Sequence, residues 1–342
     1  MHLALLARRG LLTLALASLA MAQEQRPLQV CATTSDLGSL CRAIGGDAVA
    51  VTVFARPGDD PHALEARPSF IRRLHDADAL VYVGLDLEQG WLPVLLDQAR
   101  NPRVLRGAPG HVDASRGIRP LQVPALADRS QGDVHAQGNP HYLLDPIAGL
   151  QVARTLCERF AALRPGQARE FADRLAAFHT RLAEALAGKE LAQKYEIEKL
   201  ALLAEHGRLD TFLAQQGDAA RLGGWLAATA PLRGRAVVAD HDLYPYLARR
   251  FGFTMLATLE PLPGIPPTSR HLAEVIRRMK AGNVPVVLSV PYFDRRHADF
   301  VARETGARVA ALAHQCGARP GTDEYLDLVA YNVAQLAGTD RH

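Results

Sequence analysis

The chain has 342 residues, a formal net charge of +3 and 22% charged residues, so neither sign of charge dominates. This balance gives no case for binding nucleic acid or another polyanion, and the length predicts two domains of about 100–200 residues each. Aromatic residues make up 6% of the chain. This low content argues against a cleft for an organic ligand or chelated iron, since aromatic and arginine side chains line such clefts.

The first 22 residues have the features of a secretory signal peptide. Arg8-Arg9 precede an apolar run over residues 11–20, and a small-x-small cleavage site ends at Ala22. The run is too short to cross a bilayer, and no cysteine directly follows the site to carry a lipid anchor. We expect cleavage near Ala22–Gln23 and a soluble, exported protein, most simply periplasmic, with no segment inserted into the membrane.

Four cysteines could pair in an oxidising compartment. Their spacing matches no zinc-knuckle or CxxC redox pattern, and a bond between Cys31 and Cys41 is conceivable without being predicted. The sequence leaves open the pairing of all four, which are Cys31, Cys41, Cys157 and Cys316.

Apolar runs alternate with helical patterns from Pro27 onward. In the first half the expected strands cover residues 28–33, 48–55, 79–84 and 104–105, and the expected helices cover 36–44, 68–77 and 87–98. In the second half the strands cover 236–239, 254–259, 284–290 and 308–312, and the helices 243–251, 270–281, 294–305 and 323–337. Such alternation predicts parallel sheets with helices on both faces.

The segments between the two halves have other patterns. Residues 107–139 form a long irregular stretch rich in Gly, Pro, Asp and Ser, and loops of that length are usually functional or mobile. Apolar residues recur at helical spacing from Pro146 to about Leu191, and Pro165-Gly166 divides them into two helices, the first of which would link the halves. Residues 189–221 are helical, charged and Gln-rich, and we expect an added surface hairpin there.

The predicted fold class is therefore α/β, with two similar lobes of parallel β-sheet flanked by helices and joined by a long linking helix. The predicted parts are the signal peptide at 1–22, an N-terminal lobe at 23–145 and a C-terminal lobe at 223–342. Between the lobes we expect linking helices at 146–188 and the helical insertion at 189–222.

One candidate metal ligand is His141, in the stretch Gly138-Asn139-Pro140-His141-Tyr142-Leu143-Leu144-Asp145-Pro146. Proline restricts its own backbone and that of the preceding residue, and it starts helices well, so this histidine is fixed on both sides. A histidine held in this way suits metal binding. The alternative is a loop histidine bonded to nearby backbone.

Three further histidines follow predicted strands: His62, His241 and His314. Ligands of open α/β sheets bind beyond the carboxyl ends of the strands, so two facing lobes would bring these side chains together with His141. Neutral imidazoles suit Zn, Cu, Fe and Ni, and a closed cage of three or four describes a zinc site.

Each of these histidines has an ordinary alternative. His62 alone would be a solvated loop residue, His241 would bond a neighbouring aspartate, and nothing in the sequence fixes the surroundings of His314. His135 could reach the cleft, but we interpret it as a structural loop residue.

Several motifs together resemble one known family, the metal-binding receptors of ABC importers for zinc and manganese, or cluster A-I solute-binding proteins. The resemblance covers nearly the whole mature chain. It rests on Gly58-Asp59-Asp60-Pro61-His62 with Pro68-Ser69, on the stretch from Gly138 to Pro146, on Ala239-Asp240-His241 with Tyr246, on Leu259-Glu260-Pro261 with Gly264-Ile265-Pro266-Pro267, and on Tyr325 and Asn332.

The resemblance implies a metal site between two lobes joined by a rigid helix, with His62 and His141 as the first two ligands. The third ligand is His in zinc-type members and Glu in manganese-type members, and here it is His241. The fourth ligand is commonly an acidic residue, and His314 falls at that position. Either His314 replaces the acidic ligand, or Glu260, Asp240 or a water does. Zinc-type members often carry a His-rich loop, whereas residues 107–139 offer only His111 and His135.

The resulting functional prediction is capture of Zn²⁺ and its delivery to the permease of an ABC importer, by a protein that is no enzyme and is expected to be a monomer. Mn²⁺ or iron binding is the alternative within the family. A secreted zinc hydrolase with Glu260 as base is less favoured, because the chain lacks an H-E-x-x-H motif. The sequence also leaves surface adhesion open as a main role.

Overall fold

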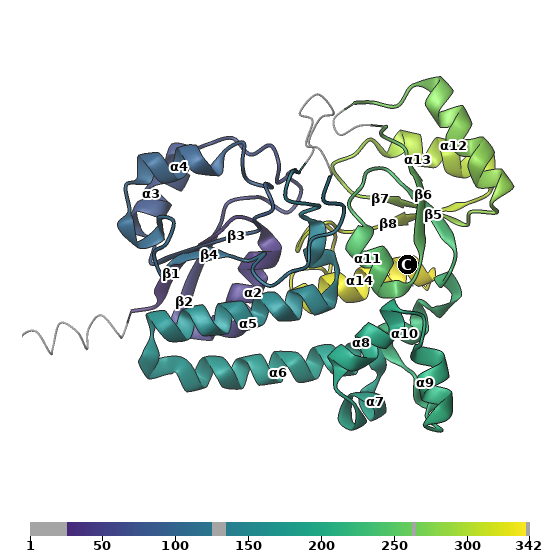
Figure 1. Ribbon diagram of the computed structural model, residues 1–342. Helices are drawn as coiled ribbons and strands as arrows, with labels where there is room; N and C mark the ends of the chain where they lie inside the picture. The colour runs from purple at the N-terminus through teal and green to yellow at the C-terminus, as the bar shows by residue number, and fades with distance from the viewer. Residues whose placement is uncertain (1–25, 125–134, 262–264, 340–342) are drawn as a thin grey trace, which may run out of the picture.

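The computed structural model describes residues 26–124, 135–261 and 265–339, which include two parallel four-stranded sheets (Figure 1). The first sheet has the order β2-β1-β3-β4 and the second the order β6-β5-β7-β8, so both lobes share one topology. This arrangement confirms the predicted fold class. The strands are β1 (Leu28–Ala32), β2 (Val49–Val53), β3 (Ala79–Tyr82), β4 (His111–Asp113), β5 (Ala236–Ala239), β6 (Thr254–Thr258), β7 (Val286–Ser289) and β8 (Arg308–Ala311).

The helices of the N-terminal lobe are α2 (Ser35–Gly45), α3 (Pro68–Asp76) and α4 (Leu92–Ala99). The strand predicted at 104–105 is wrong. Pro102–Val104 is a 3-10 turn in which the backbone N–H of Arg103 donates to the Asn101 side chain. The fourth strand is β4, inside the stretch predicted to be irregular. The helix predicted at 87–98 begins only at Leu92, and the residues before it form turns in which Leu85 and Asp86 adopt left-handed backbone angles.

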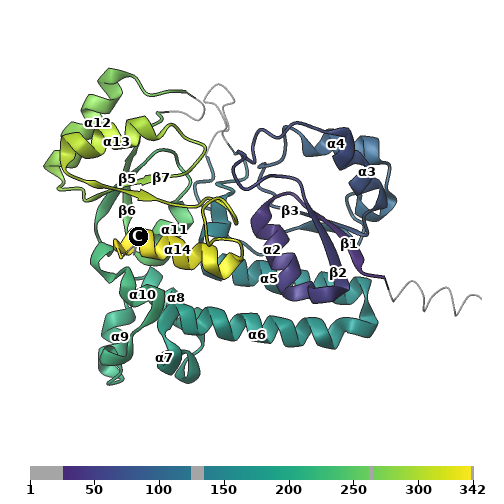
Figure 2. The ribbon, with the colours of Figure 1, turned by 180° about the vertical axis from the view of Figure 1, so that it is seen from behind.

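The linking helices are α5 (Pro146–Leu163) and α6 (Ala168–Ala187), divided as predicted at Pro165. Asp145 caps α5 by accepting a hydrogen bond from the backbone N–H of Ile147, and Pro146 occupies the first turn, where its missing N–H costs nothing. Both views show α5 and α6 lying side by side beneath the N-terminal sheet and reaching toward the helices below the C-terminal sheet (Figures 1 and 2).

Residues 189–221 do not form the predicted hairpin. They fold into α7 (Lys189–Lys194), α8 (Ile197–Glu205), α9 (Leu209–Gln215) and a 3-10 turn at Ala219–Arg221, followed by the unpredicted α10 (Gly224–Ala228). Leu200 and Ala201 of α8 are buried. These helices therefore contribute to the interior as well as to the surface, which a charged sequence with short apolar repeats did not indicate.

The C-terminal lobe adds α11 (Pro245–Phe251), α12 (Ser269–Ala281), α13 (Arg295–Thr305) and α14 (Tyr325–Ala337), each within about two residues of its predicted end points. One hydrophobic cluster runs through both sheets and the linking helices. A buried ion pair connects α11 to the start of α5: Arg250 Nε lies 2.8 Å from Oδ1 of Asp145, the residue that caps α5.

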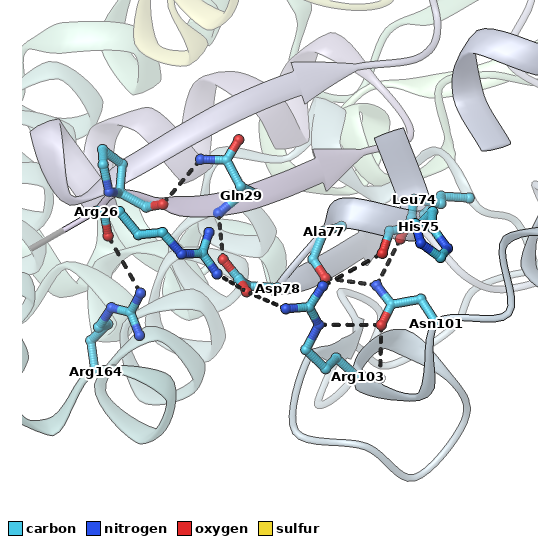
Figure 3. A network of polar contacts seen from close by, with 10 residues as sticks. Arg26, Gln29, Leu74, His75, Ala77, Asp78, Asn101, Arg103 and Arg164 are labelled. Atoms are coloured by element: carbon cyan, nitrogen blue, oxygen red, sulfur yellow. Dashed lines mark hydrogen bonds and ion pairs between the residues drawn. The ribbon is translucent and has the colours of Figure 1, made fainter. Parts of the chain in front are cut away.

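A polar network lies at the amino-terminal ends of the strands of the N-terminal sheet (Figure 3). The Asp78 carboxylate accepts hydrogen bonds from Arg26 Nη2 at 2.8 Å and from the backbone N–H of Gln29 at 2.9 Å. Asn101 Nδ2 donates to the carbonyls of Leu74 and Ala77, both at 2.7 Å. These bonds attach the start of β1 to the α3–β3 connection. The candidate site lies at the opposite end of the strands, beyond their carboxyl ends.

All four cysteines are free, so the conceivable Cys31–Cys41 bond does not form. Within the described ranges no helix is both long and apolar enough to cross a bilayer. The predicted signal peptide lies outside the described residues, and the predicted domain boundaries stay a prediction.

Candidate metal centre

His62 lies in the loop after β2, and a carboxylate fixes its ring. Asp60 Oδ1 accepts the backbone N–H of His62 at 3.0 Å and lies 2.6 Å from His62 Nδ1. Nδ1 therefore carries the proton, and the lone pair of Nε2 is available to a metal. Burial would raise the pKa of Asp60, but the hydrogen bonds from His62 outweigh it and the net shift is downward.

His141 begins the 3-10 turn His141–Leu144 just before α5. Its backbone N–H donates to Asn139 Oδ1 at 3.0 Å, and Tyr142 Oη donates to the carbonyl of Val83 at 2.7 Å, which ties the turn to the end of β3. Burial, together with the charge of neighbouring histidines, holds the pKa of His141 well below its usual range. The imidazole is therefore neutral at neutral pH, which is the metal-binding form.

The structure brings His135 to the same place. The rings of His62 and His135 have centroids 5.2 Å apart, those of His62 and His141 are 5.1 Å apart, and one ligand atom from each of the three lies within 4.8 Å of the others. The interpretation of His135 as a structural loop residue missed this placement. The backbone N–H of Gly138, with φ of 105°, donates to the carbonyl of His135, and this turn folds the loop back toward His141.

His241 follows β5 on the opposite lobe. Its Nδ1 lies 3.6 Å from Glu260 Oε2, and its ring stacks on Phe293 with centroids 5.2 Å apart. The alternative ligand Asp240 is 4% exposed and accepts the backbone N–H groups of His241 at 2.8 Å and Val290 at 2.7 Å, one on each oxygen. Asp240 is therefore used within its own lobe, while Glu260 lies beside a histidine.

His314 follows β8 in a buried loop and meets the N-terminal lobe. Its Nε2 lies 3.1 Å from the carbonyl oxygen of Asp59 and 3.1 Å from Gln315 Nε2. A carbonyl can only accept, so we assign the proton to Nε2; the other tautomer would leave a buried Nδ1–H with no acceptor. Nδ1 is buried and has no hydrogen-bond partner, and burial lowers the pKa of His314 to about 4.

A cavity of about 30 Å³ lies between the lobes, and its lining includes His141 and Pro61 of the N-terminal lobe and Tyr292 and His314 of the C-terminal lobe. This volume holds one or two bodies of the size of a water molecule, whereas organic ligands need hundreds of Å³. The arrangement suits a single ion surrounded by imidazole nitrogens.

A family model described as the periplasmic component A of a zinc-uptake complex, ZnuA, matches residues 30–217 and 223–339. The chain belongs to this family. This match confirms the resemblance seen in the motifs. The protein is thus a metal-binding periplasmic substrate-binding protein of an ABC importer, and the ZnuA family is not one of enzymes.

Relatives of the chain carry the names of different metals. The iron-binding protein YfeA of Yersinia pestis is 23% identical over 332 residues, covering 95% of this chain and 90% of its own. The high-affinity zinc uptake system protein ZnuA of Yersinia pestis is 23% identical over 288 residues, covering 81% and 79%.

Solved structures show the same fold. A crystal structure of ZnuA aligns with a TM-score of 0.65 at 23% identity, over 91% of this chain and 98% of that one. The Mn-bound periplasmic metal-binding protein of Candidatus Liberibacter asiaticus aligns with a TM-score of 0.63 at 19% identity, with coverage of 91% and 98%.

Proposed function

We propose that this protein captures Zn²⁺ in the periplasm and delivers it to the permease of an ABC importer, as a monomer with one ion held between its lobes. The observation that carries the proposal is that His141 of the N-terminal lobe and His314 of the C-terminal lobe both line one small cavity. The His62 ring lies 5.1 Å from that of His141, and the charges of His62 and His241 both help to lower the pKa of His141, so these two histidines lie close to it. Tetrahedral coordination by imidazole nitrogen is the geometry that Zn²⁺ adopts most readily.

The donor set favours zinc over manganese. Mn²⁺ prefers carboxylate oxygen, but Asp60 and Asp240 are committed to hydrogen bonds with protein groups. Glu260 lies beside His241 Nδ1 at 3.6 Å, where a carboxylate orients a ligating ring and raises its basicity. In this proposal His241 binds through Nε2 and Glu260 stays outside the shell.

Manganese or iron binding is the second candidate, because relatives are named for those metals and Glu260 lies close enough to join the shell after a side-chain rotation. Glu260 coordination would replace one nitrogen by oxygen and shift the preference toward the harder ions.

The test is titration of the metal-stripped mature protein with Zn²⁺ and Mn²⁺ by calorimetry, with a competing chelator. We expect one Zn²⁺ per chain and Mn²⁺ binding weaker by about 100-fold or more. His241→Ala should weaken Zn²⁺ binding about 100-fold or more, since loss of an outer-shell partner alone costs 10–100-fold. His206→Ala, at an exposed position that ends α8, is the matched control and should leave the affinity unchanged. Preference for Mn²⁺, or no binding of either ion, would contradict the proposal.

A further inference from the structure

We propose that His62, His135 and His141 form a zinc-binding site of their own within the N-terminal lobe, which takes the ion before the histidines of the C-terminal lobe close on it. This inference rests on the proposed function and adds an order of events to it. His135 acts in it as a first-stage ligand that later gives up the ion.

The geometry of the three rings comes close to a metal site before any metal is bound. Their ligand atoms lie within 4.8 Å of one another. Tetrahedral zinc with Zn–N bonds of about 2.0–2.1 Å needs nitrogens about 3.4 Å apart, so side-chain rotations of the order of 1 Å complete the site. Among the described residues, no other group of three His, Cys, Asp or Glu side chains meets the same distance criterion.

Contacts inside the N-terminal lobe hold all three histidines. Asp60 fixes His62 at 2.6 Å, and Tyr142 ties the turn that begins with His141 to Val83 at 2.7 Å. The loop that carries His135 is attached by Gln137, whose Nε2 donates to Asp86 Oδ1 at 2.8 Å. Each of the three histidines, or the loop that carries it, is therefore held by at least one contact from its own lobe.

The number of histidines indicates that the ion passes from one set of ligands to another. Five histidines surround the centre, but tetrahedral zinc takes four ligands. His141 also lines the cavity between the lobes, and the His62 ring lies 5.1 Å from it, whereas the His135 ring is farther from His141, with centroids 6.4 Å apart. His135 is thus the surplus ligand when His241 and His314 arrive, and exchange of one imidazole for another keeps the ion coordinated throughout closure.

The test removes the ligands of the C-terminal lobe. In the full mature protein, His241→Ala with His314→Ala should still bind one Zn²⁺, more weakly than the wild type, in calorimetric titration with Zn²⁺ alone. Adding His135→Ala to this double variant should weaken binding by a further 100-fold or so, because one of three ligands is lost. Adding His135→Gln, which keeps a polar side chain in the loop, should give the same loss, and adding His206→Ala should give none.

Trp91 supplies a second readout, because its Nε1 donates to the carbonyl of Pro61, next to His62. In a Trp225→Phe background the remaining Trp91 fluorescence should change when zinc enters the N-terminal site, even in the double variant. Circular dichroism checks that every variant is folded.

Two results would overturn the inference while the wild type still binds zinc: a double variant that binds no Zn²⁺, or a double variant whose affinity is unchanged by His135→Ala. Failure of the wild type itself to bind Zn²⁺ would overturn the proposed function and this inference together.

Discussion

Hydrogen bonds to one ring nitrogen decide which nitrogen of a histidine is left for a metal. Asp60 accepts a hydrogen bond from His62 Nδ1, and the carbonyl of Asp59 accepts one from His314 Nε2. Two consecutive residues of one turn thus orient a histidine on each lobe, and the unprotonated nitrogen is Nε2 in His62 and Nδ1 in His314. The turn itself is closed by the bond from the backbone N–H of Arg56 to Asp59 Oδ2 at 2.9 Å.

Asp36 gives a prediction at the residue scale. It starts α2, accepts the backbone N–H of Cys316 at 2.7 Å, and burial raises the pKa of its carboxyl to about 7. Between about pH 4 and about pH 7 the folded protein holds a proton that the unfolded chain releases, so the contribution of Asp36 to stability falls as pH rises.

Asp36→Asn removes this titration and keeps an oxygen to accept the same hydrogen bond. We expect the variant to become more stable relative to the wild type as the pH rises from about 5 to about 8. Thermal unfolding of both metal-free proteins across that range measures the difference. A difference that stays constant with pH would contradict the role of burial at Asp36.

The positions of single histidines after strands were readable from the sequence, but their neighbours were not. The sequence predicted that His62, His141, His241 and His314 lie near one another, and in the structure the charges of the other three all act on His141; their roles as ligands stay a prediction. His135 was misjudged because the turn at Gly138 that folds its loop back was not recognised. The Asp59–His314 contact joins residues 255 positions apart, and local pattern carries no such information.

At the scale of elements, the loop after β8 joins the two lobes. Gln315 is 1% exposed, and its Nε2 donates to the carbonyl oxygens of Arg56 at 2.9 Å and Asp59 at 3.1 Å. Its Oε1 accepts from Ser35 Oγ at 3.2 Å, at the start of α2. A single buried amide therefore connects the loop of His314 to the turn that precedes His62.

Replacement of this amide should loosen the connection. Gln315→Leu removes the hydrogen bonds of the buried amide to Arg56, Asp59 and Ser35, so we expect a loss of about 1–3 kcal/mol in the free energy of unfolding. Zinc affinity should fall about tenfold, because the loop that carries His314 is then held less firmly against the turn that precedes His62. Gln216→Leu, at an exposed position after α9, is the control. Chemical denaturation and zinc titration that show no change for Gln315→Leu would contradict a joining role for this residue.

Periodicity predicted most elements because each buries one regular face. It failed where local turns replace a regular element. Residues 102–104 form a 3-10 turn capped by Asn101, and turns that include the left-handed Leu85 and Asp86 precede α4. β4 has three residues, too few for an alternation to be visible. The helical character of residues 189–221 was predicted, but their division into α7, α8 and α9 was not, because each is too short to show a full amphipathic repeat.

At the scale of the whole molecule, one hydrophobic cluster spans both lobes, and the candidate metal centre lies where the lobes meet. Tyr325 of α14 is fully buried and donates to the carbonyl of Leu143 at 2.7 Å, while Tyr246 of α11 donates to that of Asn139 at 2.8 Å. Both bonds cross from the C-terminal lobe to the segment that carries His141. Closure on an ion therefore requires small adjustments of side chains and loops around a frame that is already assembled.

X-ray absorption at the zinc edge of the zinc-loaded mature protein tests the central claim most directly. The proposal predicts one zinc per chain with a first shell of about four nitrogen atoms at about 2.0–2.1 Å and the outer-shell scattering of imidazole. The shell should lose one imidazole in His314→Ala. A first shell that contains sulfur, or one with fewer than three imidazoles and several oxygen atoms, would contradict the histidine cage.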